Sequence, residues 1–442
     1  MKGLSFLQFV CAAALISSVI STSRAETTGF VRTSGTTFVV GQHRYGFVGA
    51  NFWYGAYLGA NIHVGERERL KRELDRLQAL GVTNLRVAAS SEGDAFTYPL
   101  TPPFEPEPGV YNETLLKGLD ILLAEVAKRD MRVVLILNNY WNWTGGMAQY
   151  VAWADNVSVP DPDRGIGTWT DYERFTSHFY QDRSAQEISR RYIARLIGRT
   201  NSVTGVVYRN DPAIMAWELA NEPRPGNGAD GADKFPDFLR WIDETARFIH
   251  TMDPNHLVTT GSEGSKGCLD DLEWAFDAHE SSGIDYVSVH LWPKNWGWFD
   301  GAKPETLAHA QVLANSYLTE HASIARRLNK PAVLEEFGLA RDANSVSPEG
   351  GTRARNAFYH FVLGSISASI RANGPFAGSN FWGWGGEGRP LHVGGKWQPG
   401  DLSYTADPYA EPQGLNSVFD SDRETNRIVG DAAADLKTAL NP

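Results

Sequence analysis

The sequence predicts a (β/α)8 barrel, an α/β fold, and two observations lead to this prediction. Apolar, β-rich runs alternate with amphipathic helical patterns, and eight such units follow one another along the chain. This order is typical of a parallel sheet with helices between its strands. Strand centres such as the VVLIL run at 133–137 are apolar throughout, as expected for strands buried on both faces. A closed eight-stranded barrel accounts for both observations better than an open sheet.

The predicted elements cover most of the chain. Strands are expected at residues 45–53, 84–90, 132–141, 214–223, 257–264, 286–293, 332–338 and 378–386, with helical patterns at 66–81, 113–130, 186–201 and 237–253. The stretch 30–47 has a Ser-Gly turn between short β-like runs, which predicts a hairpin that plugs the amino-terminal end of the barrel. No linker or repeat interrupts this pattern, so residues 26–442 are predicted to form one catalytic domain.

The first 25 residues have the features of a cleavable signal peptide. An early lysine precedes an apolar run, and small residues stand at Ser23 and Ala25. We therefore expect a secreted protein, extracellular or periplasmic. Of the two cysteines only Cys268 would remain after cleavage, which excludes an intrachain disulfide, and no Cys/His cluster has metal-site spacing. We expect no metal and no cofactor.

Charge and aromatic content indicate the kind of partner. A net charge of −11 and a pI near 5.5 argue against nucleic acid and anionic membranes. The 14 tryptophans could enlarge the core, or they could line a groove in which flat apolar rings stack on sugars. We expect a neutral substrate, and we expect the protein to be a monomer.

Carboxylates stand at the ends of two predicted strands, where the active site of a barrel lies. Asn221 and Glu222 end the fourth strand, and Glu335 and Glu336 end the seventh. A carboxylate there loses hydration unless it is partnered, and enzymes tolerate that cost where a shifted pKa is useful. Two facing carboxylates are what glycoside hydrolysis requires. Adjacent strand residues point to opposite faces, so only one of Glu335 and Glu336 should face the mouth. Glu218, earlier on its strand, is expected in a structural ion pair.

Five motifs at successive strand ends resemble glycoside hydrolase family 5, over nearly the whole mature chain. They are Arg86 in NLRV, the tripeptide Asn221, Glu222 and Pro223, His290, the EFG of Glu336 to Gly338, and the FW of Phe381 and Trp382. The stretches near Asn51, from Asn138 and from His290 resemble the β-mannanase subfamily. This resemblance implies a retaining double displacement with Glu222 as general acid/base and Glu336 as nucleophile, and the EFG motif favours Glu336 over Glu335.

The resemblance also implies roles for neighbouring residues. Arg86 would keep the nucleophile ionised, Asn221 would bind a sugar hydroxyl, and His290 would orient the reacting groups. Trp382 would lie under the reacting sugar. Many family members have Tyr where Trp292 stands, and an indole N–H can donate a hydrogen bond but not accept one.

Further tryptophans near strand ends are candidates for substrate contacts or for core packing. They are Trp53, Trp141, Trp143, Trp296, Trp298 and Trp384. As a set they favour an extended groove, and the segment 141–183 is predicted to form a long loop along one wall. The expected function is endo-hydrolysis of β-1,4-mannosidic bonds in mannan, galactomannan or glucomannan. The alternatives are a family-5 β-1,4-glucanase, an exo-acting mannosidase on the same barrel, and a non-catalytic carbohydrate-binding barrel.

Overall fold

A computed structural model describes residues 29–63, 65–401 and 404–440, so the predicted signal peptide lies outside the described residues. Eight parallel strands form one sheet in the order β8, β7, β6, β5, β4, β11, β10, β9. They are β4 (Phe47–Asn51), β5 (Asn84–Ala88), β6 (Arg132–Ile136), β7 (Ile214–Glu218), β8 (Leu257–Thr259), β9 (Val287–Leu291), β10 (Ala332–Phe337) and β11 (Phe376–Phe381). The amide of Asp285, just before β9, donates to the carbonyl of Val258 in β8 (2.8 Å) and draws the outer strands together. The predicted (β/α)8 barrel is confirmed.

The helices cover the outside of the barrel. They are α1 (Gly55–Gly59), α2 (Arg67–Ala79), α3 (Glu113–Ala127), α6 (Arg183–Ile197), α7 (Gly228–Met252), α8 (Leu272–Glu280), α9 (Leu307–Leu328), α10 (Arg353–Arg371) and α11 (Arg423–Leu440). Helix α7 begins well before the predicted 237 and contains Pro236. A proline inside a helix is a poor marker of its start, because the apolar pattern on both sides still packs against the barrel. Among the described residues, no helix is both long and apolar enough to cross a membrane.

The amino-terminal end of the barrel is closed by a small sheet. Strands β1 (Val31–Ser34), β2 (Thr37–Val40) and β3 (His43–Tyr45) pair antiparallel, so the predicted hairpin has a third strand. Phe38 of β2 is fully buried, belongs to one apolar cluster with Met215 and Val333, and packs edge-on against Tyr286 (5.4 Å between centroids). The predicted plug is confirmed.

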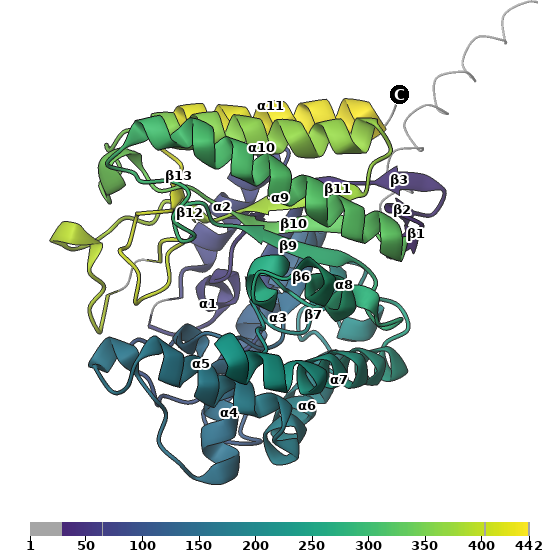
Figure 1. Cartoon of the computed structure of the whole chain (residues 1–442), viewed down its shortest axis with the longest axis vertical. Helices are drawn as coiled ribbons and strands as arrows, with labels where there is room; N and C mark the ends of the chain where they lie inside the picture. The colour runs from purple at the N-terminus through teal and green to yellow at the C-terminus, as the bar shows by residue number, and fades with distance from the viewer. Residues whose placement is uncertain (1–28, 64, 402–403, 441–442) are drawn as a thin grey trace, which may run out of the picture.

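Two long segments stand at the opposite, carboxyl-terminal end of the barrel. Residues 141–183 contain α4 (Gly146–Asp155) and α5 (Trp169–Ser177), so this segment is largely helical and not the loop that its Gly, Pro and Asp content suggested. Residues 387–417 connect β12 (Trp384–Gly386) with β13 (Val418–Phe419). Figure 1 shows this yellow-green segment and the β1–β3 sheet at opposite ends of the barrel.

Candidate active site

A cavity of about 550 Å³ opens at the carboxyl ends of the strands, where the sequence placed the site. Its lining includes many of the predicted residues, namely Trp141, Trp143, Asn221, Glu222, Trp292, Trp296, Glu336 and Trp382. The helical segment 141–183 contributes to one wall, as predicted. Its residues in the lining are Trp141, Asn142, Trp143, Asp163, Trp169 and Glu173.

Arg86 lies beneath the cavity with its guanidinium fully buried. Its Nε and Nη2 donate to the two carboxylate oxygens of Glu218 (2.7 and 2.5 Å), and Nη1 donates to Oε1 of Glu336. Nη1 also donates to Asn51 (3.0 Å) and Nη2 to Asn221 (2.7 Å). These contacts use all five N–H groups of the side chain. The expected ion pair of Glu218 is therefore present, and Arg86 touches the predicted nucleophile.

Asn221 is held on both sides of its amide. Its Oδ1 accepts from Arg86, and its Nδ2 donates to Oδ1 of Asn139 (3.1 Å). The residue lines the cavity, as a sugar-binding residue must, and its role in binding stays a prediction.

Glu335 and Glu336 differ in depth. Glu336 lines the cavity, whereas Glu335 accepts a hydrogen bond from the hydroxyl of Tyr286 (2.8 Å) below it. A register shift between Leu334 and Glu336 in the β9–β10 pairing interrupts the regular alternation. Tyr286 belongs to the apolar cluster at the amino-terminal end of the barrel, so the Glu335 carboxyl that it contacts also lies inside the barrel. Burial and the charge of Glu218 raise the pKa of Glu335, and Arg86 lowers it. Only Glu336 lines the cavity, as the EFG motif favoured, but Glu335 does not point to the opposite face, because the bulge turns both side chains inward.

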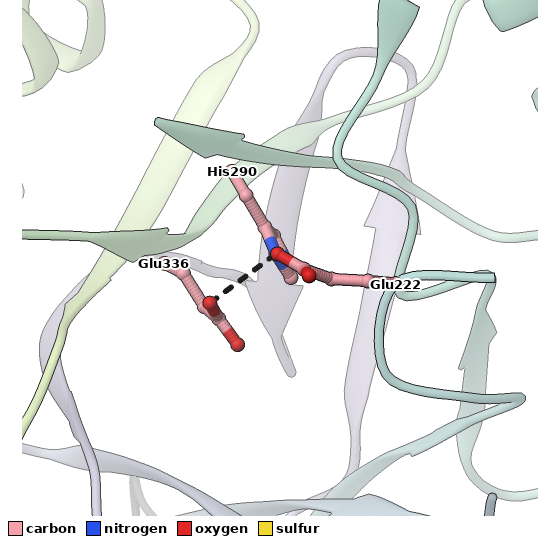
Figure 2. A group of neighbouring side chains, drawn as sticks. All are labelled: Glu222, His290 and Glu336. Carbon is pink, nitrogen blue, oxygen red and sulfur yellow. Dashed lines mark hydrogen bonds and ion pairs between the residues drawn. The ribbon is translucent and has the colours of Figure 1, made fainter. Parts of the chain in front are cut away.

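Glu222, in the segment that follows β7, approaches Glu336 across the mouth, with His290 of β9 between them (Figure 2). Nδ1 of His290 lies 2.8 Å from Oε1 of Glu222 and 3.4 Å from Oε2 of Glu336. One ligand atom from each of the three residues lies within 4.8 Å of the others. Burial lowers the pKa of His290 well below its usual value, so the ring is neutral. His290 thus contacts both carboxylates, and its role in orienting them stays a prediction.

Trp292, which stands where many family members have Tyr, contacts the predicted nucleophile. Its indole Nε1 donates to Oε2 of Glu336 (2.9 Å), and its ring packs edge-on against Trp382 (5.9 Å between centroids). An N–H donor suits a carboxylate that must stay ionised, because it stabilises the negative charge.

Burial raises the pKa of both Glu222 and Glu336, while neighbouring positive charges oppose the shift. Each carboxylate accepts from an indole N–H, Glu336 from Trp292 and Glu222 from Trp141. Glu336 also accepts directly from the guanidinium of Arg86, whereas Arg224 acts on Glu222 only through space. Since two close carboxylates do not both ionise readily, the pair titrates as a unit. The direct guanidinium contact stabilises the negative charge of Glu336.

Three predicted tryptophans lie outside the cavity lining. Trp53 is only 1% exposed and donates from Nε1 to the carbonyl of Ala406 (2.7 Å), and its ring packs among other aromatic rings. Trp384 is fully buried and donates to Glu73 (3.0 Å). Trp298 packs on Trp296. The predicted substrate contact of Trp53 is thus wrong, because the residues that follow β12 cover its ring.

Two functional candidates were missed. Arg224 donates from Nε and Nη2 to Oε2 of Glu263 (2.7 and 2.6 Å), and its guanidinium lies 4.9 Å from the ring centre of Trp141. Burial raises the pKa of Glu263 to about 7. Glu263 follows the fifth strand, so the rule that identified Glu222 and Glu336 would have found it. The residues Pro408, Ala410, Glu411 and Asn416, which also line the cavity, come from an irregular segment that gives no such signal.

Comparison with known proteins agrees with this geometry. A family model described as GH family 5 beta-mannosidase-like matches residues 28–441. The chain is 30% identical over 368 residues to mannan endo-1,4-beta-mannosidase 5 of Arabidopsis thaliana, covering 80% of this chain and 78% of the relative. Mannan endo-1,4-beta-mannosidase 4 of Oryza sativa subsp. japonica is also 30% identical, over 80% of this chain and 73% of its own length.

Solved structures resemble the chain as well. A glycoside hydrolase family 5 mannosidase from Rhizomucor miehei has 34% identity and a TM-score of 0.85, covering 94% of this chain and 99% of its own. The endo-1,4-beta-mannanase of the same fungus has 23% identity and a TM-score of 0.65, covering 93% of this chain and 100% of its own, and this likeness concerns the fold alone. The chain is therefore a glycosidase that belongs to glycoside hydrolase family 5, among its mannosidases and mannanases.

Proposed function

We propose that the protein is a retaining β-mannosidase that releases mannose from the ends of β-1,4-linked manno-oligosaccharides. The observation that carries this proposal is the shape of the site. The cavity is lined by residues of the segment 141–173 and by Pro408, Ala410, Glu411 and Asn416, which follow β12. We infer that the second segment closes the cavity beyond the sugar that Trp382 would carry. A bounded cavity suits a chain end, and an open groove would suit the middle of a polymer.

The spacing of the carboxyl groups supports retention of configuration. Retaining enzymes hold the two groups about 5 to 5.5 Å apart, and inverting enzymes hold them about 6.5 to 9.5 Å apart. The approach of Glu222, His290 and Glu336 to within 4.8 Å of one another fits the shorter range.

The steps follow from the placement of charge. Glu222 donates its proton to the glycosidic oxygen while an oxygen of Glu336 attacks the anomeric carbon, so the leaving sugar departs with the proton. Glu222, now ionised, takes a proton from water, and that water attacks the same carbon and releases Glu336. Arg86 and Trp292 stabilise the Glu336 carboxylate before attack and after release.

No metal or cofactor enters this mechanism. Within the described part of the chain, Glu222, His290 and Glu336 do have a spacing that could suit a cation. However, Arg86 already supplies a positive charge to Glu336, and His290 contacts Glu222. We expect activity to survive dialysis against a chelator; loss that added metal restores would contradict this.

The proposed substrate is supported by the relatives. A variant of the Rhizomucor miehei mannosidase was solved in complex with mannosyl-fructose, at 34% identity to this chain and a TM-score of 0.85. The plant relatives, at 30% identity, favour a second candidate, endo-acting mannanase activity, which the sequence had favoured first.

Product profiling on mannohexaose separates the two candidates. Chain-end action releases mannose as the first product and leaves the viscosity of galactomannan almost unchanged. Internal action yields mannobiose and mannotriose early, with a rapid fall in viscosity, and would reject the proposed exo mode. Cello-oligosaccharides serve as the comparison substrate, since faster cleavage of these would instead indicate a β-1,4-glucanase.

We propose export as well, because residues 1–25 have the pattern of a leader. Sequencing the amino terminus of the protein recovered from the host's medium or periplasm tests this, with cleavage after Ala25 expected. A monomer in solution is the accompanying proposal, checked by light scattering.

A further inference from the structure

Trp169 is an exposed aromatic residue at the mouth of the cavity. It lines the cavity and is 45% exposed, whereas Trp143, Trp292 and Trp382 in the same lining are less than 10% exposed. A large indole left in contact with water beside a ligand site offers an apolar face for a ligand.

The position of this indole is fixed by its helix. Trp169 is the first residue of α5, whose start has a capping box: Thr168 accepts from the amide of Asp171 (3.2 Å), and the Asp171 carboxylate accepts from the amide of Thr168 (2.9 Å). One turn on, the hydroxyl of Tyr172 donates to the carbonyl of Tyr140 beyond β6 (2.6 Å). The exposed ring is therefore held in place before any ligand arrives, which lowers the entropy cost of binding.

Trp141 lies between the ring of Trp169 and the carboxyl group of Glu222, and contacts both. Its Nε1 donates to Oε2 of Glu222 (2.6 Å), and its ring packs edge-on against Trp169 with 6.1 Å between centroids. Because the acid/base must touch the leaving oxygen, Trp141 flanks the first sugar of the leaving group. Trp169, one ring farther from Glu222, then flanks the second.

Polar groups stand beside the exposed ring. Nδ2 of Asn142 donates to Oδ2 of Asp163 (2.9 Å), and both residues line the cavity. A flat apolar face beside amide and carboxylate groups matches a pyranose, which has a C–H face and a rim of hydroxyl groups.

We propose that Trp169 forms the platform for the second sugar of the leaving group, a neutral pyranose of the oligosaccharide chain. The inference rests on the proposed function, because Glu222 defines the leaving-group side. It assigns a length preference: substrates with two sugars beyond the scissile bond gain a contact that shorter ones lack.

The test compares kcat/KM for mannotriose, mannobiose and 4-nitrophenyl β-mannoside. In Trp169→Ala we expect kcat/KM for mannotriose to fall about tenfold, with changes of less than about twofold for the two shorter substrates. Trp169→Tyr, which keeps a ring, should restore most of the loss. Trp298→Ala is the matched control, because this residue packs on Trp296 outside the cavity lining.

Each outcome decides between the possibilities. An unchanged kcat/KM for mannotriose, or equal losses on mannotriose and mannobiose, would overturn the platform while leaving the proposed function intact. Wild-type enzyme inactive on all three mannosides would instead refute the proposed function, and the platform with it. If Trp169→Ala melts at a much lower temperature than the wild type, Trp169→Tyr becomes the deciding variant. A fall in its kcat/KM that is as large for mannobiose as for mannotriose would then overturn the platform.

Discussion

The two ends of the barrel interior have opposite chemistry. At the amino-terminal end Phe38, Met215 and Val333 form an apolar cluster under the small β1–β3 sheet. At the carboxyl-terminal end Arg86 and Glu218 are buried together beneath Glu336. One end buries apolar surface, which stabilises the fold, and the other buries charges, which cost free energy unless they are paired. The difference teaches that stability and activity should respond to different substitutions.

Glu336→Ala tests the carboxyl-terminal end most severely. Without the nucleophile we expect kcat on mannobiose to fall on the order of 10⁴-fold or more. The melting temperature should change little, because Glu218 still pairs with Arg86. Wild-type activity in this variant would contradict the mechanism.

Glu222→Ala should have a graded effect. On mannobiose we expect kcat to fall roughly 10²- to 10⁴-fold, because the leaving oxygen receives no proton. On 2,4-dinitrophenyl β-mannoside, whose leaving group needs no proton, the first step should remain fast. In the wild type, kcat/KM should decrease as pH rises through the raised pKa of Glu222. In the variant on 2,4-dinitrophenyl β-mannoside, this decrease should be absent. Equal losses on both substrates would argue against the acid role.

Arg86→Met should lower both stability and activity, unlike substitutions that affect only one of them. Removing the cation leaves Glu218 and Glu336 buried without their charge partner, which costs about 3 to 5 kcal/mol of unfolding free energy. Activity should fall with it. Arg86→Lys is the control: it keeps the charge but loses the fork that binds Glu218 through two hydrogen bonds. Chemical denaturation measures the first effect and initial rates the second.

Phe38→Ala should affect the other end alone. We expect a loss of about 3 to 5 kcal/mol in unfolding free energy, because the substitution leaves a cavity under the barrel. The kcat of the folded fraction should stay at the wild-type value. Phe38→Leu, which keeps most of the volume, should cost less than about 1.5 kcal/mol. A large fall in kcat with either variant would show that the two ends are coupled.

The smallest expected effect concerns pH. Burial raises the pKa of Glu92 to about 8, from an ordinary value of 4.5. The folded protein then holds a proton that the unfolded chain has released, so stability falls as pH rises from about 4.5 to about 8. Glu92→Gln should remove part of this fall, about 1 to 3 kcal/mol between pH 5 and pH 8. An identical slope in variant and wild type would show that Glu92 is ionised in the fold.

The strand order and both carboxyl groups could be predicted from the sequence, because apolar periodicity and strand-end polarity are local signals. Glu222 and Glu336 each stand at the end of an apolar run, and Arg86 and His290 each interrupt one. Trp53 has the same signal and lies in the core, because a segment more than 300 residues later covers it. When a segment that is distant in the sequence buries a residue, the sequence around that residue gives no signal of it.

The cavity walls could be predicted only in part. The segment 141–183 was identified as a wall by its composition, but its helices were missed because Gly, Pro and Asp also occur between short helices. Pro408 to Asn416 reach the cavity through an irregular path, held by contacts such as those of the Asp407 carboxylate with the amides of Gly414 and Asn416 (2.8 and 2.9 Å). An irregular segment of this kind has no hydrophobic periodicity from which its path could be predicted.

The bulge in β10 has a consequence for protein engineering. Idealising a strand removes irregularities, and in most sheets this improves a scaffold. Here a straightened β10 would send one of Glu335 and Glu336 to the outside of the barrel among the helices. Anyone who transplants this site onto another barrel must therefore copy the irregular backbone together with the side chains.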